Sequence, residues 1–197
     1  KKGWLIDLRM ALMEPTDLRG IPYYNQAENT MSWAHPVDLP TAAQAAEYDI
    51  VILFLDELNS APMATQAAAY QLVLNGRIGT YQLPDNCVIV AAGNRETDRG
   101  VTYRMPSPLA NRFVHVEVAA DFDTWQEWAV ENQIHPDVLG YLTFSKNDLY
   151  NFDAGSNERS FATPRSWVFV SELLQEEDGD PDMAESEITD LVAGTVG

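Results

Sequence analysis

Residues 50–57 read Ile50-Val-Ile-Leu-Phe-Leu-Asp-Glu57, so that six apolar residues run directly into two adjacent carboxylates. An apolar run this short is typical of a central strand in a parallel sheet covered on both faces. Ligands of open α/β sheets bind at the carboxyl ends of such strands. Because two acids are costly to hold there unless a cation or a reacting water uses them, Asp56 and Glu57 predict a chemical site. Taken alone, the two acids could also be interpreted as an ordinary cap or as part of an ion pair.

Other strand and helix patterns surround this central run. Further strands are predicted by three apolar runs, at residues 4–8, 87–92 and 113–118. Residues 63–75 favour a helix that Gly76 ends, and the many turn formers of 14–40 predict a loop or hairpin. Strands that alternate with helices and loops are the signature of a parallel α/β sheet, which we predict for residues 1–120.

Helical patterns replace strand patterns from about residue 121. Asp123 and Gln126 have the spacing of a capping box, and Pro136 starts a second helix. Thr163-Pro164 supplies the N-cap and the first residue of a third helix. We therefore predict that residues 121–197 form a small α-helical domain, incomplete and with an acidic C-terminal segment.

The composition excludes several classes of protein. The formal net charge is −18, and after Arg165 the chain has nine acidic residues but no Lys or Arg, which opposes binding to nucleic-acid phosphates. We interpret the acidic segment as solvated chain rather than a binding tail, although a salt-adapted source would give the same excess. The single cysteine, Cys87, excludes a disulfide framework and favours a cytoplasmic location. No apolar stretch approaches the roughly 20 residues that span a bilayer.

Three further residues are candidates for the same site as the acids. Asn94 follows the next predicted strand, where its amide would orient a water or touch a phosphate, although Asn after Gly is usually a turn residue. Arg112 precedes the run at 113–118 and would alternatively pair with a nearby acid. Arg165 opens a predicted helix, where the macrodipole disfavours a cation unless an anion is bound. The alternative for Arg165 is an exposed side chain bonded to a neighbouring carboxylate.

Taken together, five segments resemble motifs of AAA+ ATPases and are most similar to the MoxR-like branch. These segments are Asp17-Leu-Arg-Gly-Ile-Pro22, Leu55-Asp-Glu-Leu-Asn-Ser-Ala-Pro62, Ala91-Ala-Gly-Asn-Arg-Glu-Thr-Asp-Arg-Gly100, Leu109-Ala-Asn-Arg-Phe113 and Ala162-Thr-Pro-Arg-Ser-Trp167. The resemblance implies a P-loop NTPase-type parallel sheet flanked by helices, followed by a small α-helical lid. It also implies that residues of about 18–40 form the hairpin insert typical of this branch.

The resemblance implies a role for each candidate residue, with ATP and Mg²⁺ as cofactors. Asp56 would hold Mg²⁺ through water, and Glu57 would activate the attacking water. Asn94 resembles sensor 1, which positions that water, and Arg165 resembles sensor 2 in the lid. Arg112 resembles the arginine finger that reaches the nucleotide of a neighbouring subunit. Positioning and charge neutralisation of this kind are what phosphoryl transfer requires.

The resemblance also implies partner proteins and an incomplete AAA+ module. The family implies a hexameric ring with a chaperone-like remodelling role, and a partner with a von Willebrand factor A domain. Arg99 and Arg104 are further candidates for the subunit interface, with a plain surface role equally open. No G-x-x-x-x-G-K-[ST] occurs in the chain, so we expect an internal portion of the AAA+ module. ATP hydrolysis is accordingly expected of the full-length parent protein rather than of these residues alone.

Two other functions remain open at this point. The first is a non-catalytic AAA+-fold scaffold that serves assembly and has no P-loop. The second is a metal-dependent hydrolase of another class that uses Asp56 and Glu57. That hydrolase would need further acids or histidines at strand ends, and the sequence offers none that is convincing.

Overall fold

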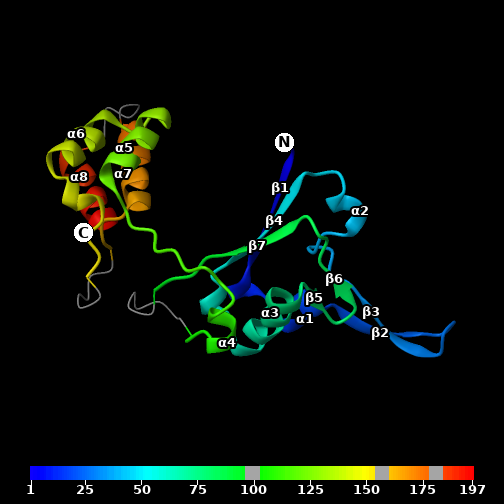
Figure 1. Cartoon of the computed structure of the whole chain (residues 1–197). Coiled ribbons are helices and arrows are strands. Elements are labelled where there is room, and N and C mark those ends of the chain that lie inside the picture. The colour runs from blue at the N-terminus through cyan, green and yellow to red at the C-terminus, as the bar shows by residue number, and fades with distance from the viewer. Residues whose placement is uncertain (96–102, 154–159, 178–183) are drawn as a thin grey trace. The chain divides into compact units, whose positions relative to one another are not determined.

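The computed structural model describes residues 1–95, 103–153, 160–177 and 184–197 (Figure 1). Within it the chain divides into two compact units, Lys1–His115 and Val116–Gly197, each of which is described by itself. Arg99, the end of the segment at 91–100 and part of the acidic run lie outside the described residues. Within the described residues, no helix combines the length and apolar character needed to cross a bilayer.

The first unit contains a parallel sheet, two small hairpins and several short helices. In chain order its elements are β1 (Gly3–Arg9), a 3₁₀ turn (Met10–Leu12), α1 (Pro15–Arg19), β2 (Ile21–Asn25), β3 (Thr30–Ala34), α2 (Ala42–Ala45), β4 (Ile50–Asp56), a 3₁₀ turn (Leu58–Ser60), α3 (Met63–Asn75), β5 (Arg77–Ile78), β6 (Tyr81–Gln82), β7 (Cys87–Ala91) and α4 (Ser107–Ala110). The predicted helix at 63–75 is confirmed, and Gly76 ends it with a left-handed backbone and an N–H that donates to Leu72.

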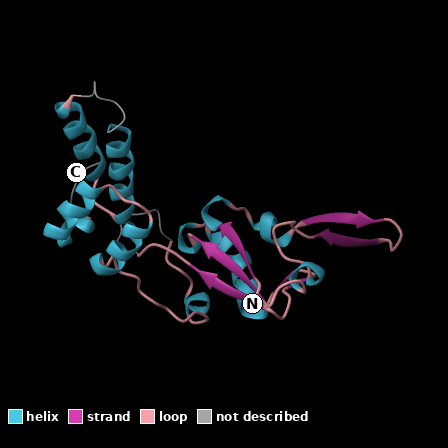
Figure 2. Cartoon of the chain, turned by 90° about the horizontal axis from the view of Figure 1, so that it is seen from above, coloured by secondary structure: helices cyan, strands magenta, loops and turns pink. Residues whose placement is uncertain are grey.

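The three-stranded sheet is parallel, with β4 between β1 and β7 (Figure 2). Leu55 of β4 lies opposite Leu8 of β1 on one side and Ala91 of β7 on the other. Strands that alternate with helical connections produce this arrangement because parallel neighbours need a crossover. The predicted α/β class is therefore confirmed, and a parallel sheet flanked by helices fits the P-loop NTPase type of fold.

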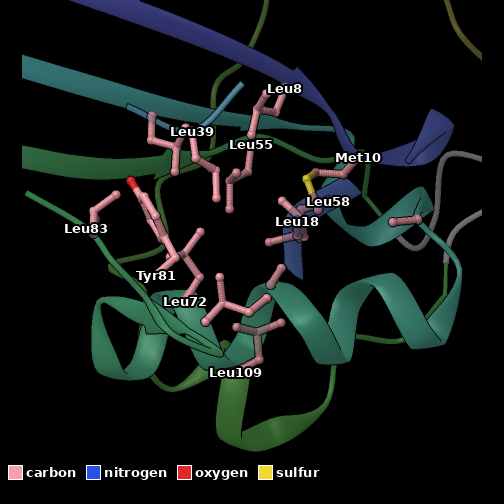
Figure 3. Close-up of a cluster of buried hydrophobic side chains, with 14 residues drawn as sticks. Leu8, Met10, Leu18, Leu39, Leu55, Leu58, Leu72, Tyr81, Leu83 and Leu109 are labelled. Atoms are coloured by element: carbon pink, nitrogen blue, oxygen red, sulfur yellow. The ribbon is translucent and has the colours of Figure 1, made fainter. Parts of the chain in front are cut away.

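The core of the first unit lies between the sheet and α3 (Figure 3). Leu53 and Leu55 point to this side of β4, and Ala69 and Leu72 of α3 belong to the same buried cluster. Leu58, directly after the two acids, is also buried in this cluster at 1% exposure. Apolar burial of this kind stabilises a domain by about 25 cal/mol per Å². The turn that follows Asp56 and Glu57 is therefore anchored in the core.

The opposite face of the sheet is less covered than the sequence predicts. Alternation along β4 directs Ile52 and Phe54 to this face, where both are only half-buried. On the flanking strands, Leu5 is 61% exposed and Val88 is 49% exposed. The expectation that the run at 50–55 is covered on both faces is wrong for this face, because Ile52 and Phe54 are only half-buried there.

A β-hairpin formed by β2 and β3 extends from the first unit in both views (Figures 1 and 2). Its strands pair antiparallel from Ile21–Ala34 to Asn25–Thr30, which confirms the predicted hairpin in 14–40. Gly20 enters the hairpin with φ +86°, where a Cβ would overlap the backbone of Ala34. Glycine is therefore required at this bend. Helix α1, which precedes the hairpin, was not predicted.

The run at 113–118 forms no strand, contrary to the prediction. Val114 and Val116 are 93% and 78% exposed, so the alternating valines face solvent rather than a core. A strand needs a neighbour to take its N–H and C=O groups. Among the described strands none pairs with this run. The β-branched pattern alone therefore does not produce a strand.

The second unit is helical. Its described elements are α5 (Phe122–Glu131), α6 (Pro136–Phe144), a 3₁₀ turn (Lys146–Leu149), α7 (Pro164–Glu177) and α8 (Glu185–Val196). Trp125, Leu142 and Trp167 contribute buried side chains to its core. The indole N–H of Trp167 donates to the carbonyl of Asp148 at 2.8 Å, which satisfies a polar group inside this core. Pro136 and Pro164 begin their helices as predicted.

The N-terminus of α5 differs in detail from the predicted capping box. The capping residue is Asp121, whose carboxylate accepts hydrogen bonds from the N–H and the hydroxyl of Thr124. Asp123 instead forms an ion pair of 2.7 Å with Lys146, and Gln126 donates to Thr143. The helix begins two residues earlier than predicted, because Phe122 at 7% exposure belongs to its buried face.

Candidate functional site at the carboxyl end of β4

Asp56 and Glu57 lie where β4 ends, as the sequence predicts. Ala92 forms backbone hydrogen bonds with the residues on either side of the two acids. Its N–H donates to the carbonyl of Leu55, and its carbonyl accepts from the N–H of Leu58, both at 3.0 Å. Asp56 and Glu57 therefore lie directly beside the carboxyl end of β7. Asp56 is half-buried and Glu57 is exposed, so both carboxylates are accessible from solvent.

Glu57 has a left-handed backbone, with φ 53° and ψ 35°. A side chain with a Cβ adopts this conformation at a cost of about 1 kcal/mol or more, and such residues cluster at functional sites. The Glu57 N–H donates to Oδ1 of Asp56 at 2.9 Å, and Ser60 donates to the Glu57 carbonyl at 2.9 Å. Together with buried Leu58, these bonds hold Glu57 in its strained conformation.

Asn94 is at the same edge of the sheet, three residues after the end of β7. Its side chain is exposed, and its backbone carbonyl accepts a hydrogen bond of 2.5 Å from the side-chain amide of Asn59. Asn59 belongs to the 3₁₀ turn that follows Glu57. The structure thus brings Asp56, Glu57 and Asn94 together at adjacent strand ends, which is the arrangement the sequence predicts.

Arg112 lies outside this group. It follows α4 on an exposed turn, where its N–H donates to the carbonyl of Leu109 at 3.0 Å. Leu109 is fully buried and anchors the turn in the core. No hydrogen bond or ion pair among the described residues joins Arg112 to Asp56 or Glu57. Arg104, also exposed, precedes the same helix.

Arg165 belongs to the second unit, as the second residue of α7. The helix start has the predicted cap: Ser166 donates its N–H to the hydroxyl of Thr163 at 3.0 Å, and Thr163 donates its N–H to the Ser166 hydroxyl at 2.7 Å. Arg165 is exposed beside these capped groups. Its position relative to Asp56, Glu57 and Asn94 stays a prediction.

The site contains donor groups that suit magnesium but not a protein-only metal cage. No three His, Cys, Asp or Glu side chains of the described residues gather as metal ligands. Mg²⁺ is commonly bound by one or two carboxylates together with water and substrate phosphates. Asp56 fits that pattern, since Oδ2 of its accessible carboxylate accepts no hydrogen bond from the described residues. The thiol of Cys87 is a poor nucleophile, because burial raises its pKa.

Asn59 is the residue at this site that sequence reasoning missed. Its backbone carbonyl accepts a hydrogen bond of 2.7 Å from the N–H of Tyr103, in addition to the bond its side chain donates to Asn94. By residue type alone this asparagine resembles an ordinary turn residue. The available signals are its place in the segment 55–62, which resembles an AAA+ motif, and its position two residues after Glu57 at a strand end.

Comparisons with known proteins give only distant similarity. No family model matches the sequence, and no curated protein matches it either. Two solved structures align with 88% of the chain at 16% identity: a "putative ATPase" from Cytophaga hutchinsonii, with a TM-score of 0.39, and a single-site mutant of RuvB from Thermotoga maritima, with a TM-score of 0.43. The chain spans 46% of each of these proteins. At this level of similarity neither structure assigns the chain to a family.

Proposed function

We propose that the chain is part of a MoxR-like AAA+ ATPase subunit, whose full-length form hydrolyses ATP in a ring and remodels other proteins. One observation carries the proposal: Asp56, Glu57 and Asn94 lie at adjacent carboxyl ends of β4 and β7, held together by the hydrogen bonds of Ala92 and Asn59. Ligands of open α/β sheets bind at such strand ends. The motif resemblance specifies which ligand we expect.

Each residue has a distinct task in the proposed reaction. Asp56 would hold Mg²⁺ through water, and the ion would supply neutralisation of the phosphate charge. Glu57 accepts a proton from the attacking water, and its exposed carboxylate is accessible for that role. The side chain of Asn94 orients the same water. The hydrogen bond to Asp56 and the burial of Leu58 fix the backbone of Glu57. The position from which its carboxylate extends is therefore defined.

The two arginines act as charge-neutralising groups in this proposal. Arg112, exposed on an anchored turn, reaches the nucleotide of a neighbouring subunit as an arginine finger. Arg165, at the start of α7, contacts phosphate as sensor 2 of a helical lid. A guanidinium suits both roles because it stays charged and binds phosphate with two donors. A hexameric ring, a cytoplasmic location and a von Willebrand factor A partner belong to the same proposal.

The test of the proposal uses the full-length protein. Glu57→Gln should retain ATP binding and lose turnover, because the amide keeps the size of the side chain but cannot take a proton. Glu47→Gln is the matched control, since it removes the same charge from an exposed position of the first unit. Turnover unchanged by Glu57→Gln would remove Glu57 from the base role.

A non-catalytic scaffold is the second candidate, because a phosphate-binding loop is not among these 197 residues. The coding sequence upstream of Lys1 separates the two functions. A glycine-rich loop with Lys and Ser/Thr encoded there would supply the phosphate cradle, and its absence would contradict ATP hydrolysis. ATP binding by the full-length protein gives the same answer by an independent measurement.

A further inference from the structure

We propose that Asn59 is a positioning residue that fixes Asn94 relative to Asp56 and Glu57, and that efficient turnover depends on it. This inference rests on the proposed ATPase function. Asn59 itself is not expected to touch the nucleotide. It acts by connecting the turn that follows the two acids to the segment that carries Asn94.

Asn59 forms hydrogen bonds to two points that are distant from it in sequence. Its Nδ2 donates to the carbonyl of Asn94, 35 residues away, at 2.5 Å. Its own carbonyl accepts from the N–H of Tyr103 at 2.7 Å. One residue therefore binds the chain both at Asn94 and at Tyr103.

The contact with Gly93 shows that the side chain of Asn59 is closely packed. A Cβ added at Gly93 would overlap Oδ1 and lie 2.8 Å from Cγ of Asn59, so alanine at this position would displace the asparagine side chain. The same Oδ1 is buried and receives no hydrogen bond from the described residues. An unsatisfied buried acceptor is unfavourable. The bond from Nδ2 and the packing against Gly93 hold the side chain in place despite this unsatisfied acceptor.

The turn that contains Asn59 is anchored to the rest of the first unit. Its neighbour Leu58 is buried at 1% exposure, and the N–H of Leu58 donates to Ala92. The turn is thus fixed both to the core and to the end of β7. Since misplacement of a catalytic group by about 1 Å can lower a rate by about a hundredfold, a connection of this kind matters for Asn94. Loss of the connection should affect turnover more than nucleotide binding.

The first experiment compares variants of the full-length protein. Asn59→Asp keeps the shape of the side chain but cannot donate to the Asn94 carbonyl, and Asn59→Ala removes the group. For both we expect kcat to fall by about tenfold or more while KM for ATP changes by less than about twofold. Asn75→Asp, at the exposed end of α3, makes the same chemical change away from the site. Unchanged kcat in Asn59→Asp would overturn the inference.

The second experiment tests the contact by a double-mutant cycle. Gly93→Ala alone should lower kcat, because its Cβ displaces the Asn59 side chain. In an Asn59→Ala background the same change should add little, since the atom that the new Cβ would meet is gone. Losses that simply add in the double variant would contradict the inference. A uniform fall in thermal stability would not produce this non-additivity.

Amide hydrogen exchange keeps this inference separate from the proposed function. In Asn59→Asp the bond from Nδ2 to the Asn94 carbonyl is lost, so the N–H of Ala92, which is bonded to Leu55 two residues before Asn94, should exchange faster than in the wild type, whether or not ATP is hydrolysed. A wild-type protein without turnover would reject the ATPase proposal, and the role of Asn59 in positioning turnover would fall with it. If wild-type turnover is present, unaltered exchange at Ala92 in Asn59→Asp would overturn the role of Asn59 and leave the ATPase proposal intact.

Discussion

The backbone N–H of Glu57 donates a hydrogen bond of 2.9 Å to Oδ1 of Asp56, so each of the two acids restrains the other. This bond forms because Glu57 turns into the left-handed region directly after the strand. One oxygen of Asp56 is thereby engaged, and its second oxygen receives no hydrogen bond from the described residues. The strained backbone of Glu57 and the Asp56 oxygen that receives no such bond therefore lie at the same point of the fold.

Glu57→Gly should raise the free energy of unfolding while it removes turnover. The left-handed backbone costs a residue with a Cβ about 1 kcal/mol or more, and glycine avoids that cost. We expect a gain of up to about 1 kcal/mol in the full-length protein, measured by denaturant unfolding. Glu57→Ala keeps the Cβ and serves as the control, with equal loss of turnover but no gain. Equal stability of the two variants would show that no strain is stored at Glu57.

Arg112→Ala subunits mixed with Glu57→Gln subunits should recover part of the ATPase activity. Neither variant alone is expected to turn over ATP. If sites form between subunits, a mixed ring combines the intact Glu57 of one chain with the intact Arg112 of its neighbour. Activity is measured as phosphate release over a range of mixing ratios. A mixture as inactive as its two components would count against action of Arg112 on a neighbouring subunit.

Two glycines should respond to alanine in opposite directions. At Gly20, with φ +86°, a Cβ would overlap the backbone of Ala34, so Gly20→Ala should destabilise the hairpin by at least about 1 kcal/mol. At Gly140, in the middle of α6, a Cβ would meet nothing within 4 Å. Gly140→Ala should stabilise that helix by about 0.5–1 kcal/mol. Calorimetry of the full-length protein measures both changes, and effects of the same sign would contradict the backbone argument.

Acid should weaken the helical unit through Asp121 and Asp148. Hydrogen bonds from the N–H and hydroxyl of Thr124 hold the pKa of Asp121 below its ordinary value of 3.8. Hydrogen bonds from the hydroxyls of Tyr141 and Ser145 lower the pKa of Asp148 in the same way. A carboxyl whose pKa is lower in the folded state stabilises fully above its ordinary pKa and loses that effect as pH falls through the folded value. We therefore expect the loss to begin below about pH 4.

The variant that checks this pH dependence is Asp121→Asn, because asparagine still caps a helix but does not titrate. Its thermal midpoint should decline less with acid than that of the wild type. Asp190→Asn makes the same change at an exposed position of α8 and should decline as the wild type does. A decline in Asp121→Asn as steep as in the wild type would assign the acid sensitivity to other groups.

Local signals in the sequence were sufficient for several elements. The apolar run at 50–55 predicts a strand, and Gly76 and Thr163 predict the end of α3 and the start of α7, because each depends on a few adjacent residues. The strand predicted at 113–118 is wrong because its formation depends on a distant segment rather than on adjacent residues. Its valines have the pattern of a strand, but a strand also requires a neighbour with which to pair.

The candidate site was predictable in part. Parallel strands end at one edge of a sheet, which is why the sequence predicts Asn94 beside Asp56 and Glu57, and the pairing of β4 with β7 agrees with it. The role of Asn59 was not predictable. Its contacts with Asn94 and Tyr103 join residues that no local pattern relates. The proposed tasks of Arg112 and Arg165 stay predictions.

The sequence by itself determined the local conformations and the chemical types: a buried strand that ends in two acids, capped helices and glycines at bends. These follow from backbone preferences and from the periodicity of apolar side chains, both of which act over a few residues. Only the tertiary structure decided that β4 is covered closely on one face and that Glu57 adopts a left-handed backbone. It also decided that Asn59 connects the acids to Asn94. Those features depend on hydrogen bonds and packing between distant segments, which form only when the chain has folded.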